Sequence, residues 1–346
     1  MSKTLQDYAT LINDTIQSNE INHYITTDNM CQNLGGIDTF KNINIPQGKV
    51  RSFQKDDVLL SNIRLYFRKV YRAKQKGGCS SDVLVFRAKH IDSATLFAIL
   101  SSQIFTDYAC SGSQGSKMPR GNKTHMMDFK IPTINFTIAK IFNSIQNKIE
   151  NNHKINELLH TLAYKIYEYY FKYKPKNAKL EQIIIENPKS SIMVKNAQKT
   201  QDKYPFFTSG DNILSYPKAI IDGRNCFLNT GGNAGIKFYV GKASYSTDTW
   251  CICANEFSDY LYLLLSSIKN HINQSFFQGT SLKHLQKNLL KKYPIYMPSA
   301  HEIKKFNQIM MPLLTLISIN TRTSKKLEQI RDFLLPLLLK QQVKPQ

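Results

Sequence analysis

A heptad pattern of apolar residues runs through residues 138–170, whose sequence is IAKIFNSIQNKIENNHKINELLHTLAYKIYEYY. Steps of four and three residues alternate along it without interruption, and most of the positions that they select are apolar. These positions are Ile138, Phe142, Ile145, Ile149, Asn152, Asn156, Leu159, Ala163, Ile166 and Tyr170. This period is typical of a long helix that packs lengthwise against a second helix.

A second heptad pattern near the C-terminus supplies the partner helix. It selects Ile303, Phe306, Met310, Leu313, Ile317, Asn320, Ser324, Leu327, Arg331 and Leu334. Both patterns carry Asn near the middle, and a buried Asn costs stability but can fix the register of paired helices. We therefore expect two matched helices of about 35–40 residues, each roughly 55 Å long, that pair with each other. The alternative is that both are core helices of one large domain.

The start of the second helix has a signature of its own. Ser299 followed by Glu302 predicts a capping box at its N-terminus. Pro312 lies inside the heptad pattern, and we expect it to kink the helix or to displace its start.

The two halves of the chain repeat each other in order and spacing. Asp82 and Asp248 each follow a short polar run and precede an apolar run, and Pro132 and Pro298 each lie 50 residues further on. A long heptad pattern follows each proline. An internal repeat of this kind predicts two equivalent domains.

The segments before the long helices indicate a mixed composition of strands and helices. Each has one predicted helix, at 93–108 and at 256–271. Short apolar runs between turn residues predict strands at 58–60, 83–86, 183–185 and 219–221. We expect an α+β protein with a pseudo-two-fold internal repeat. Its predicted parts are domain 1 at 1–133, a long helix at 134–174, domain 2 at 175–298 and a second long helix at 299–346.

The charge of the chain indicates a polyanionic partner. The 346 residues include 46 Lys and Arg but 25 Asp and Glu, which gives a net charge of +21. Nucleic acid is the first candidate, and an anionic membrane surface is the second. No apolar run approaches the ~20 residues that span a bilayer, and we expect a cytoplasmic protein without membrane contact.

Motifs for catalysis, cofactors and metals are missing from the sequence. There is no phosphate-binding loop, no methyltransferase Asn-Pro-Pro-aromatic motif and no zinc spacing among the six cysteines. The E-x-K string at 302–304 falls at a helix start rather than on a strand. Asp82 and Asp248 occur once per repeat and are interpreted as turn residues. We predict no catalytic residue, no cofactor site and no metal ligand on this chain.

Basic, amide and hydroxyl residues gather in segments that resemble loops. Arg can bind guanine through paired hydrogen bonds and Gln or Asn can bind adenine, while Lys and Ser hold phosphates. In the first half the candidate DNA-binding residues are Arg64, Arg68, Lys69, Gln114, Ser116, Lys117, Arg120, Asn122 and Lys123. In the second half they are Thr208, Ser209, Asn229, Thr230, Asn233, Lys237, Gln278, Thr280, Lys283 and His284. For any one of them the alternative is an ordinary solvated side chain.

Several strings, in order and in both halves, resemble one known family. They lie at 57–64, 77–82, 115–120, 204–210, 279–285 and 327–338. Together they are similar to the specificity subunit of type I restriction-modification systems, and the resemblance covers nearly the whole chain. It implies two target recognition domains separated by two long antiparallel helices.

The resemblance also implies a function and partners. Each recognition domain would read one half of an asymmetric, bipartite site in double-stranded DNA, and the helices would hold the halves apart. Two methylation subunits would dock on the helices and bind S-adenosylmethionine, and restriction subunits would use ATP and Mg. The chain itself would be a non-catalytic subunit. The alternatives are a basic coiled-coil scaffold, a non-specific nucleic-acid-binding protein, and a fused restriction and methylation enzyme.

Overall fold

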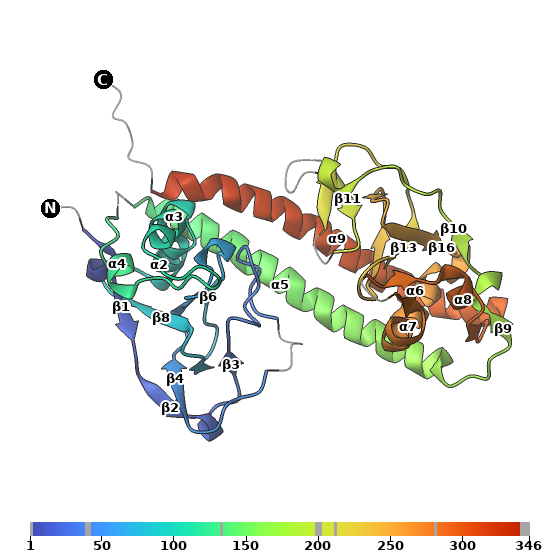
Figure 1. The fold of residues 1–346 in the computed structure, drawn as a ribbon, viewed down its shortest axis with the longest axis horizontal. Coiled ribbons are helices and arrows are strands. Elements are labelled where there is room, and N and C mark those ends of the chain that lie inside the picture. Colours follow the sequence, from blue (N-terminus) through green and yellow to red (C-terminus); the bar gives the residue numbers. More distant parts are fainter. Residues whose placement is uncertain are drawn as a thin grey trace. The chain divides into compact units, whose positions relative to one another are not determined.

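Residues 3–38, 43–131, 134–197, 203–210, 213–279 and 282–339 are described by the structure, which is a computed structural model (Figure 1). The chain divides into two units. Unit 1 consists of residues 1–151 and 326–346, and unit 2 consists of residues 152–325. Each unit combines mostly antiparallel sheets with helices, so the predicted α+β class with two mixed domains is confirmed.

The main sheet of unit 1 has four antiparallel strands. Their order is β1 (Ala9–Ile12), β8 (Val83–Ala88), β5 (Val58–Ser61) and β6 (Val70–Arg72). β5 is buried on both faces. Val58 and Leu60 pack with helices α2 (Ser93–Leu100) and α3 (Gln103–Ser111), while Leu59 packs into a second cluster on the other face. This double burial explains the continuous apolar run in the sequence.

A second sheet and two short helices complete the domain part of unit 1. The order of this sheet is β2 (Thr15–Gln17), β4 (Lys49–Phe53), β7 (Gly77–Cys79) and β3 (Tyr24–Ile25). β3 and β7 are parallel, whereas the other pairs are antiparallel. The short helices are α1 (Leu5–Tyr8) and α4 (Lys123–Met127).

Unit 2 repeats the main sheet of unit 1. Its strand order is β10 (Ile185–Glu186), β16 (Thr249–Cys253), β13 (Arg224–Asn229) and β14 (Ile236–Val240), all antiparallel. Helices α6 (Ser258–Ser267) and α7 (Lys269–Ser275) follow β16, as α2 and α3 follow β8. Asp82 and Asp248 lie in the tight turns that precede β8 and β16. The two units therefore share the internal repeat that the sequence predicts.

Smaller elements surround this sheet in unit 2. A three-stranded sheet has the order β12 (Leu214–Tyr216), β11 (Tyr204–Phe207) and β15 (Ser244–Tyr245), with β11 and β15 parallel. Two-stranded pairs join β17 (Phe277–Gln278) to β18 (His284–Leu285) and β19 (Pro294–Ile295) to β9 (Ala178–Lys179). Helix α8 (Lys287–Lys291) lies between β18 and β19 in the chain.

Four local predictions need correction. The helix expected at 93–108 is two helices, because Ser102 ends the first and caps α3 by accepting a hydrogen bond from the Phe105 amide at 3.2 Å. The helix expected at 256–271 is likewise divided, into α6 and α7. The runs 183–185 and 219–221 are not strands, since only Ile185 lies in β10 and only Ile221 forms an isolated bridge. Short apolar runs therefore do not by themselves distinguish strands from turns.

The long helices α5 (Phe136–Tyr167) and α9 (Ala300–Leu338) each have residues in both units. Glu302 accepts hydrogen bonds from the amide and the hydroxyl of Ser299, both at 2.9 Å, which confirms the capping box. Because α9 begins at Ala300 and continues past Pro312, the proline does not displace its start. Among the helices that the structure describes, none has the length and hydropathy that crossing a bilayer requires.

The heptad positions form the contact between the two helices within each unit. Every predicted heptad residue is buried or half-buried. In unit 2, Asn152 donates to the Ser324 hydroxyl at 3.1 Å, and Asn320 donates to the Asn156 side chain at 3.0 Å. Because the α9 number falls as the α5 number rises, these segments are antiparallel. In unit 1 the buried Arg331 donates to the Gln146 side chain at 3.0 Å.

Asn152→Ala tests this polar contact. Asn152 and Ser324 are 2% and 3% exposed, so the substitution removes a hydrogen bond from a dry seam and should cost about 1–3 kcal/mol. The shift of the urea midpoint measures the cost. Asn151→Ala, at the exposed neighbouring position, is the matched control. Equal midpoints for the two variants would contradict a stabilising role for the contact.

Candidate nucleic-acid interface

An exposed loop in unit 1 is closed by two backbone hydrogen bonds. The Gln114 amide donates to the Arg120 carbonyl at 2.9 Å, and the Arg120 amide donates to the Gln114 carbonyl at 2.8 Å. Gly115 has a φ of +99°, a conformation in which glycine is favoured, and it starts the loop. The side chains of Ser116, Lys117 and Met118 are exposed, so the loop presents them to solvent.

Unit 2 contains the same loop. The pairing of β17 with β18 places Gln278 opposite His284, six residues later, as Gln114 lies opposite Arg120. Gly279 has a φ of +140° and takes the place of Gly115. Gln278, Lys283 and His284 are exposed. Thr280, one of the predicted binding residues, lies outside the described residues.

A second turn in each unit is tied to this loop by its backbone. In unit 1 the Arg64 amide donates to the Pro119 carbonyl at 2.9 Å. In unit 2 the Gly232 amide donates to the Lys283 carbonyl, also at 2.9 Å. The turns are further held by the carbonyls of Asp82 and Asp248, which accept from the amides of Asn62 and Thr230 at 2.8 and 3.2 Å. These contacts make both aspartates turn residues, as predicted.

A third turn follows the parallel strand of each smaller sheet. The Asp28 amide donates to the Thr26 hydroxyl at 3.1 Å, and the Gly210 amide donates to the Thr208 hydroxyl at 3.0 Å. A lysine supports each turn, because Lys69 donates to the Thr27 carbonyl and Lys237 donates to the Thr208 carbonyl. The turn at 26–28 was not among the predicted binding segments. The sequence signal for it is a threonine that follows two apolar or aromatic residues, which occurs at 24–26 and again at 206–208.

These three turns define what we call the loop face of each unit. It consists of residues 26–28, 62–64 and 114–120 in unit 1, and of residues 208–210, 230–232, 278–279 and 282–284 in unit 2. In unit 1 the three turns meet around a hollow of about 140 Å³. Its lining residues are Thr27, Asp28, Ser61, Ile63, Arg64, Phe67, Lys69 and Met118.

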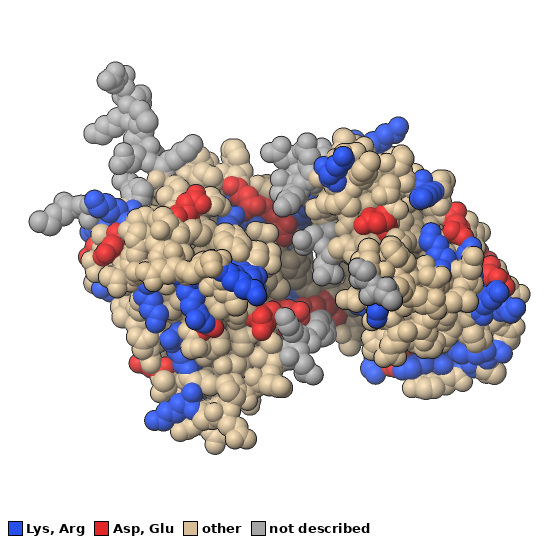
Figure 2. Space-filling model, viewed as in Figure 1, with Lys and Arg blue, Asp and Glu red and all other residues tan. Residues whose placement is uncertain are grey.

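Cations stand at the rim of the loop face in unit 1. Arg120 forms an ion pair with Asp82 at 3.0 Å, yet 61% of its side chain is exposed. Arg64 donates from Nη2 to the Lys117 carbonyl at 3.3 Å, while the Lys117 side chain is exposed. On the face drawn in Figure 2, Lys and Arg side chains are spread over both units. A surface of this kind suits a polyanion.

Some predicted binding residues have structural contacts instead. Arg68 donates to the Ser101 carbonyl at 2.9 Å, and burial lowers the pKa of its guanidinium. Asn122 caps α4 by accepting from the His125 amide at 3.1 Å, and Lys123 is the exposed first residue of that helix. The side chains of Arg68 and Asn122 are therefore engaged in structural contacts.

The polar residues of unit 2 similarly stabilise its turns. The hydroxyls of Ser209 and Thr230 both donate to the Asp248 carbonyl, which joins two of the turns. Asn229 is 7% exposed and donates to the Asn233 carbonyl at 3.1 Å. Lys237 also donates to the Gly210 carbonyl, at 2.6 Å. The exposed side chains of this loop face belong mainly to the 278–284 loop.

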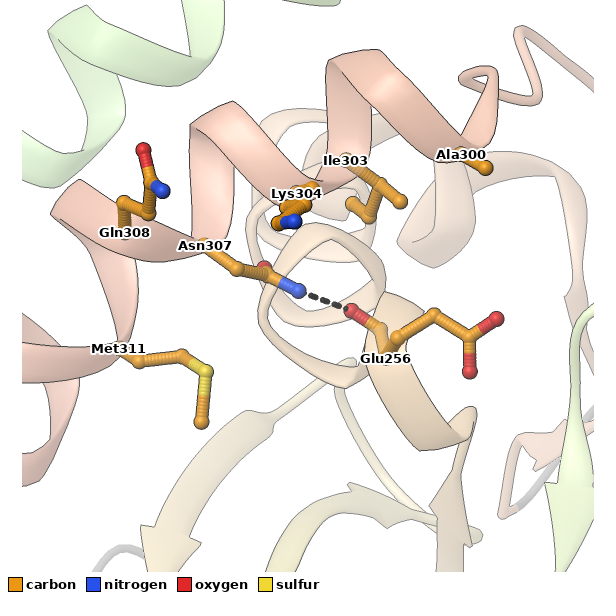
Figure 3. A pocket seen from close by; sticks show the side chains of 7 residues that line it. All are labelled: Glu256, Ala300, Ile303, Lys304, Asn307, Gln308 and Met311. Atoms are coloured by element: carbon orange, nitrogen blue, oxygen red, sulfur yellow. Dashed lines mark hydrogen bonds between the residues drawn. The ribbon is translucent and has the colours of Figure 1, made fainter.

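A second hollow, of about 400 Å³, lies at the start of α9 in unit 2 (Figure 3). The Asn307 side chain donates to the Glu256 carbonyl at 2.7 Å across it. Its lining is Glu256, Ala300, Ile303, Lys304, Asn307, Gln308 and Met311, which provides no nucleophile with an adjacent base. Glu302 of the E-x-K string is engaged in the helix cap, where the Ser299 amide and the Tyr296 hydroxyl lower the pKa of its carboxyl group. In the described part of the chain, no three His, Cys, Asp or Glu side chains are grouped as metal ligands.

The chain is similar to one family model and to several solved structures. Residues 176–329 match the model of the type I restriction modification DNA specificity domain. The crystal structure of the type I restriction-modification system S subunit from M. genitalium is similar over 99% of this chain and 96% of that one, with 13% identity and a TM-score of 0.65. The HsdS subunit from Thermoanaerobacter tengcongensis is similar over 98% of this chain and 96% of that one, with 13% identity and a TM-score of 0.37. No curated protein sequence matches the chain.

The first structural likeness shows that the chain has the fold of a type I specificity subunit. Together with the match at 176–329, it confirms the predicted resemblance to this family. The individual binding residues stay predictions.

The glycines that open the two exposed loops allow a matched test of the loop geometry. A Cβ on Gly279 would lie 2.4 Å from the Leu282 carbonyl oxygen, whereas one on Gly115 would have no atom closer than 3.6 Å. Both positions have positive φ, so both alanine variants carry a backbone penalty of about 1 kcal/mol. Gly279→Ala adds a clash with backbone, worth roughly 1–3 kcal/mol more. Thermal unfolding should show the larger loss for Gly279→Ala, and the reverse order would contradict the loop geometry.

Proposed function

We propose that this chain is the DNA-recognition subunit of a type I restriction-modification complex. In this proposal each loop face reads one half of an asymmetric, bipartite site in double-stranded DNA. The observation that carries the proposal is the repetition of one backbone frame with different exposed residues. Unit 1 presents Gln114, Lys117 and Arg120, while unit 2 presents Gln278, Lys283 and His284.

The chemistry of these side chains suits the two tasks of a DNA reader. Lysines at a loop tip can neutralise phosphates, which gives affinity and sets the position on the duplex. Arg and Gln side chains can form paired hydrogen bonds with guanine and adenine in the major groove. Since the equivalent loops differ in sequence, we infer that the two half-sites differ as well.

The long helices supply the remaining part of the proposal. α5 and α9 each contribute to both units, and we infer that they set the spacing between the half-sites. Ile155, Leu158 and Leu162 form an exposed apolar stripe on α5, with exposures of 41%, 59% and 48%. We assign this stripe to the docking of methylation subunits. S-adenosylmethionine, ATP and Mg would then act on partner subunits, and this chain would be non-catalytic.

Selection from random duplex DNA tests the proposal. The chain, with the subunits that co-purify with it, is expected to enrich two different short motifs at constant separation. Enrichment of no motif, despite tight binding at low salt, would favour the non-specific scaffold instead. If bulk RNA displaces the bound DNA as readily as target DNA does, the non-specific scaffold is favoured as well.

Lys117→Ala tests the phosphate contact at the loop tip of unit 1. The variant should bind all sequences more weakly, and the slope of log affinity against log salt should fall in magnitude by about one. Binding titrations at several salt concentrations measure both effects. Lys154→Ala is the control, because Lys154 is an exposed lysine on α5 outside the loop face. Identical salt slopes for the two variants would show that Lys117 does not contact a phosphate.

Leu158→Glu combined with Leu162→Glu tests the docking stripe. Two charges on an apolar contact should abolish co-purification of methylation subunits, because a buried unpaired charge is strongly unfavourable. DNA selection by the remaining chain should keep its motifs. Thr161→Glu, at an exposed polar position between them, is the control. Retained co-purification in the double variant would place the docking surface elsewhere.

A further inference from the structure

Arg64 in unit 1 and Gly232 in unit 2 occupy the same place in the repeated frame. Asn62 and Thr230 donate their amides to the carbonyls of Asp82 and Asp248. Arg64 and Gly232 each lie two residues further along the chain. Each donates its own amide to the loop carbonyl at 2.9 Å. The residue before each one bridges to Arg120 or His284. The two units are therefore directly comparable at this position.

The frame requires a left-handed backbone here. Gly232 has a φ of +78°, and Arg64 has a φ of +50°. Glycine adopts this conformation without steric cost, whereas a residue with a Cβ is disfavoured in it. An arginine at a position that suits glycine points to a use for its side chain.

The surroundings of Arg64 hold its guanidinium in place. Nη2 donates to the Lys117 carbonyl at 3.3 Å, and the guanidinium carbon lies 6.0 Å from the centre of the Phe67 ring. Nε is buried without a hydrogen-bond partner in the described part of the chain. The side chain lines the hollow between the three turns beside Met118. The guanidinium is thus held at the loop face by the Lys117 carbonyl and the Phe67 ring rather than mobile in solvent.

The surroundings of Gly232 differ from those of Arg64. Among the described residues other than its chain neighbours, no atom lies within 4 Å of the place where its Cβ would be. Unit 2 therefore has no side chain at this position, where unit 1 has an oriented guanidinium.

We propose that Arg64 is a specificity-determining residue that reads one guanine in the half-site of unit 1, and that Gly232 leaves the equivalent base unread in unit 2. The inference rests on the proposed function and deepens it. The terminal N–H groups of a guanidinium match guanine O6 and N7, which is the commonest specific contact of arginine with DNA. A phosphate contact needs no such preorganisation, because an exposed lysine such as Lys117 can supply it.

Arg64→Gly and Arg64→Lys are the primary test variants, each purified with its partner subunits and selected against random duplex DNA. Arg64→Gly suits the backbone, so its thermal midpoint should stay near that of the unaltered chain. The preference for guanine at one position of the unit 1 motif should fall by roughly 5- to 150-fold. Every other position, and the whole unit 2 motif, should be unchanged. Arg64→Lys keeps the charge but loses the planar fork, so it should lose the same preference.

Gly232→Arg is the converse variant. A Cβ here meets no described atom outside the neighbouring residues, and a new guanine preference should appear at one position of the unit 2 motif. Arg120→Ala is a second control, because Arg120 already has Asp82 as a partner and should alter a different position or none.

The outcomes separate this inference from the proposed function. If Arg64→Gly weakens all sequences equally and lowers the salt slope by about one, Arg64 is a phosphate contact and the inference is overturned, while the proposed function stands. An unchanged unit 1 motif in both Arg64 variants overturns it too. If the unaltered chain enriches no motif, the proposed function itself fails and the inference fails with it.

Discussion

The backbone hydrogen bond between the turn after the central strand and the exposed loop is the contact on which each loop face depends. It joins Arg64 to Pro119 in unit 1 and Gly232 to Lys283 in unit 2, at 2.9 Å in both. Because it uses main-chain atoms, it constrains backbone conformation but not side-chain identity. The loop residues can therefore differ between the units while the geometry that presents them stays the same.

Sequence periodicity was sufficient for the long helices and for the repeat. Each heptad position lies on the helix face that is buried, and polar members such as Asn152 and Arg331 find partners on the facing helix or beside it. A pattern of this length averages over many residues, so local exceptions such as Pro312 do not obscure it. The repeat was likewise predictable, because an aspartate before an apolar run and a later heptad pattern mark the same order of elements in both halves of the chain. Pro132 lies outside the described residues.

The loop faces could be predicted only in part, since they depend on contacts between distant segments. Residues 26–28 and 115–119 are almost ninety residues apart and were linked by no sequence pattern. Arg68 and Arg64 are four residues apart with the same charge, yet Arg68 turns toward the Ser101 carbonyl while Arg64 reaches the loop. Composition identifies such clusters but does not determine which of their members face outward.

The internal repeat provides a second backbone with which the conformation of Arg64 can be compared. In one domain alone, an arginine with positive φ is uncommon, and nothing shows whether the backbone there requires that residue. The second domain supplies that comparison, because it has the same backbone bonds and a glycine in the same conformation. The repeated backbone bonds therefore do not require an arginine at this position, and the arginine does not stabilise the backbone conformation. What differs between the two positions is a guanidinium at the loop face, so function rather than folding is the better explanation for its presence.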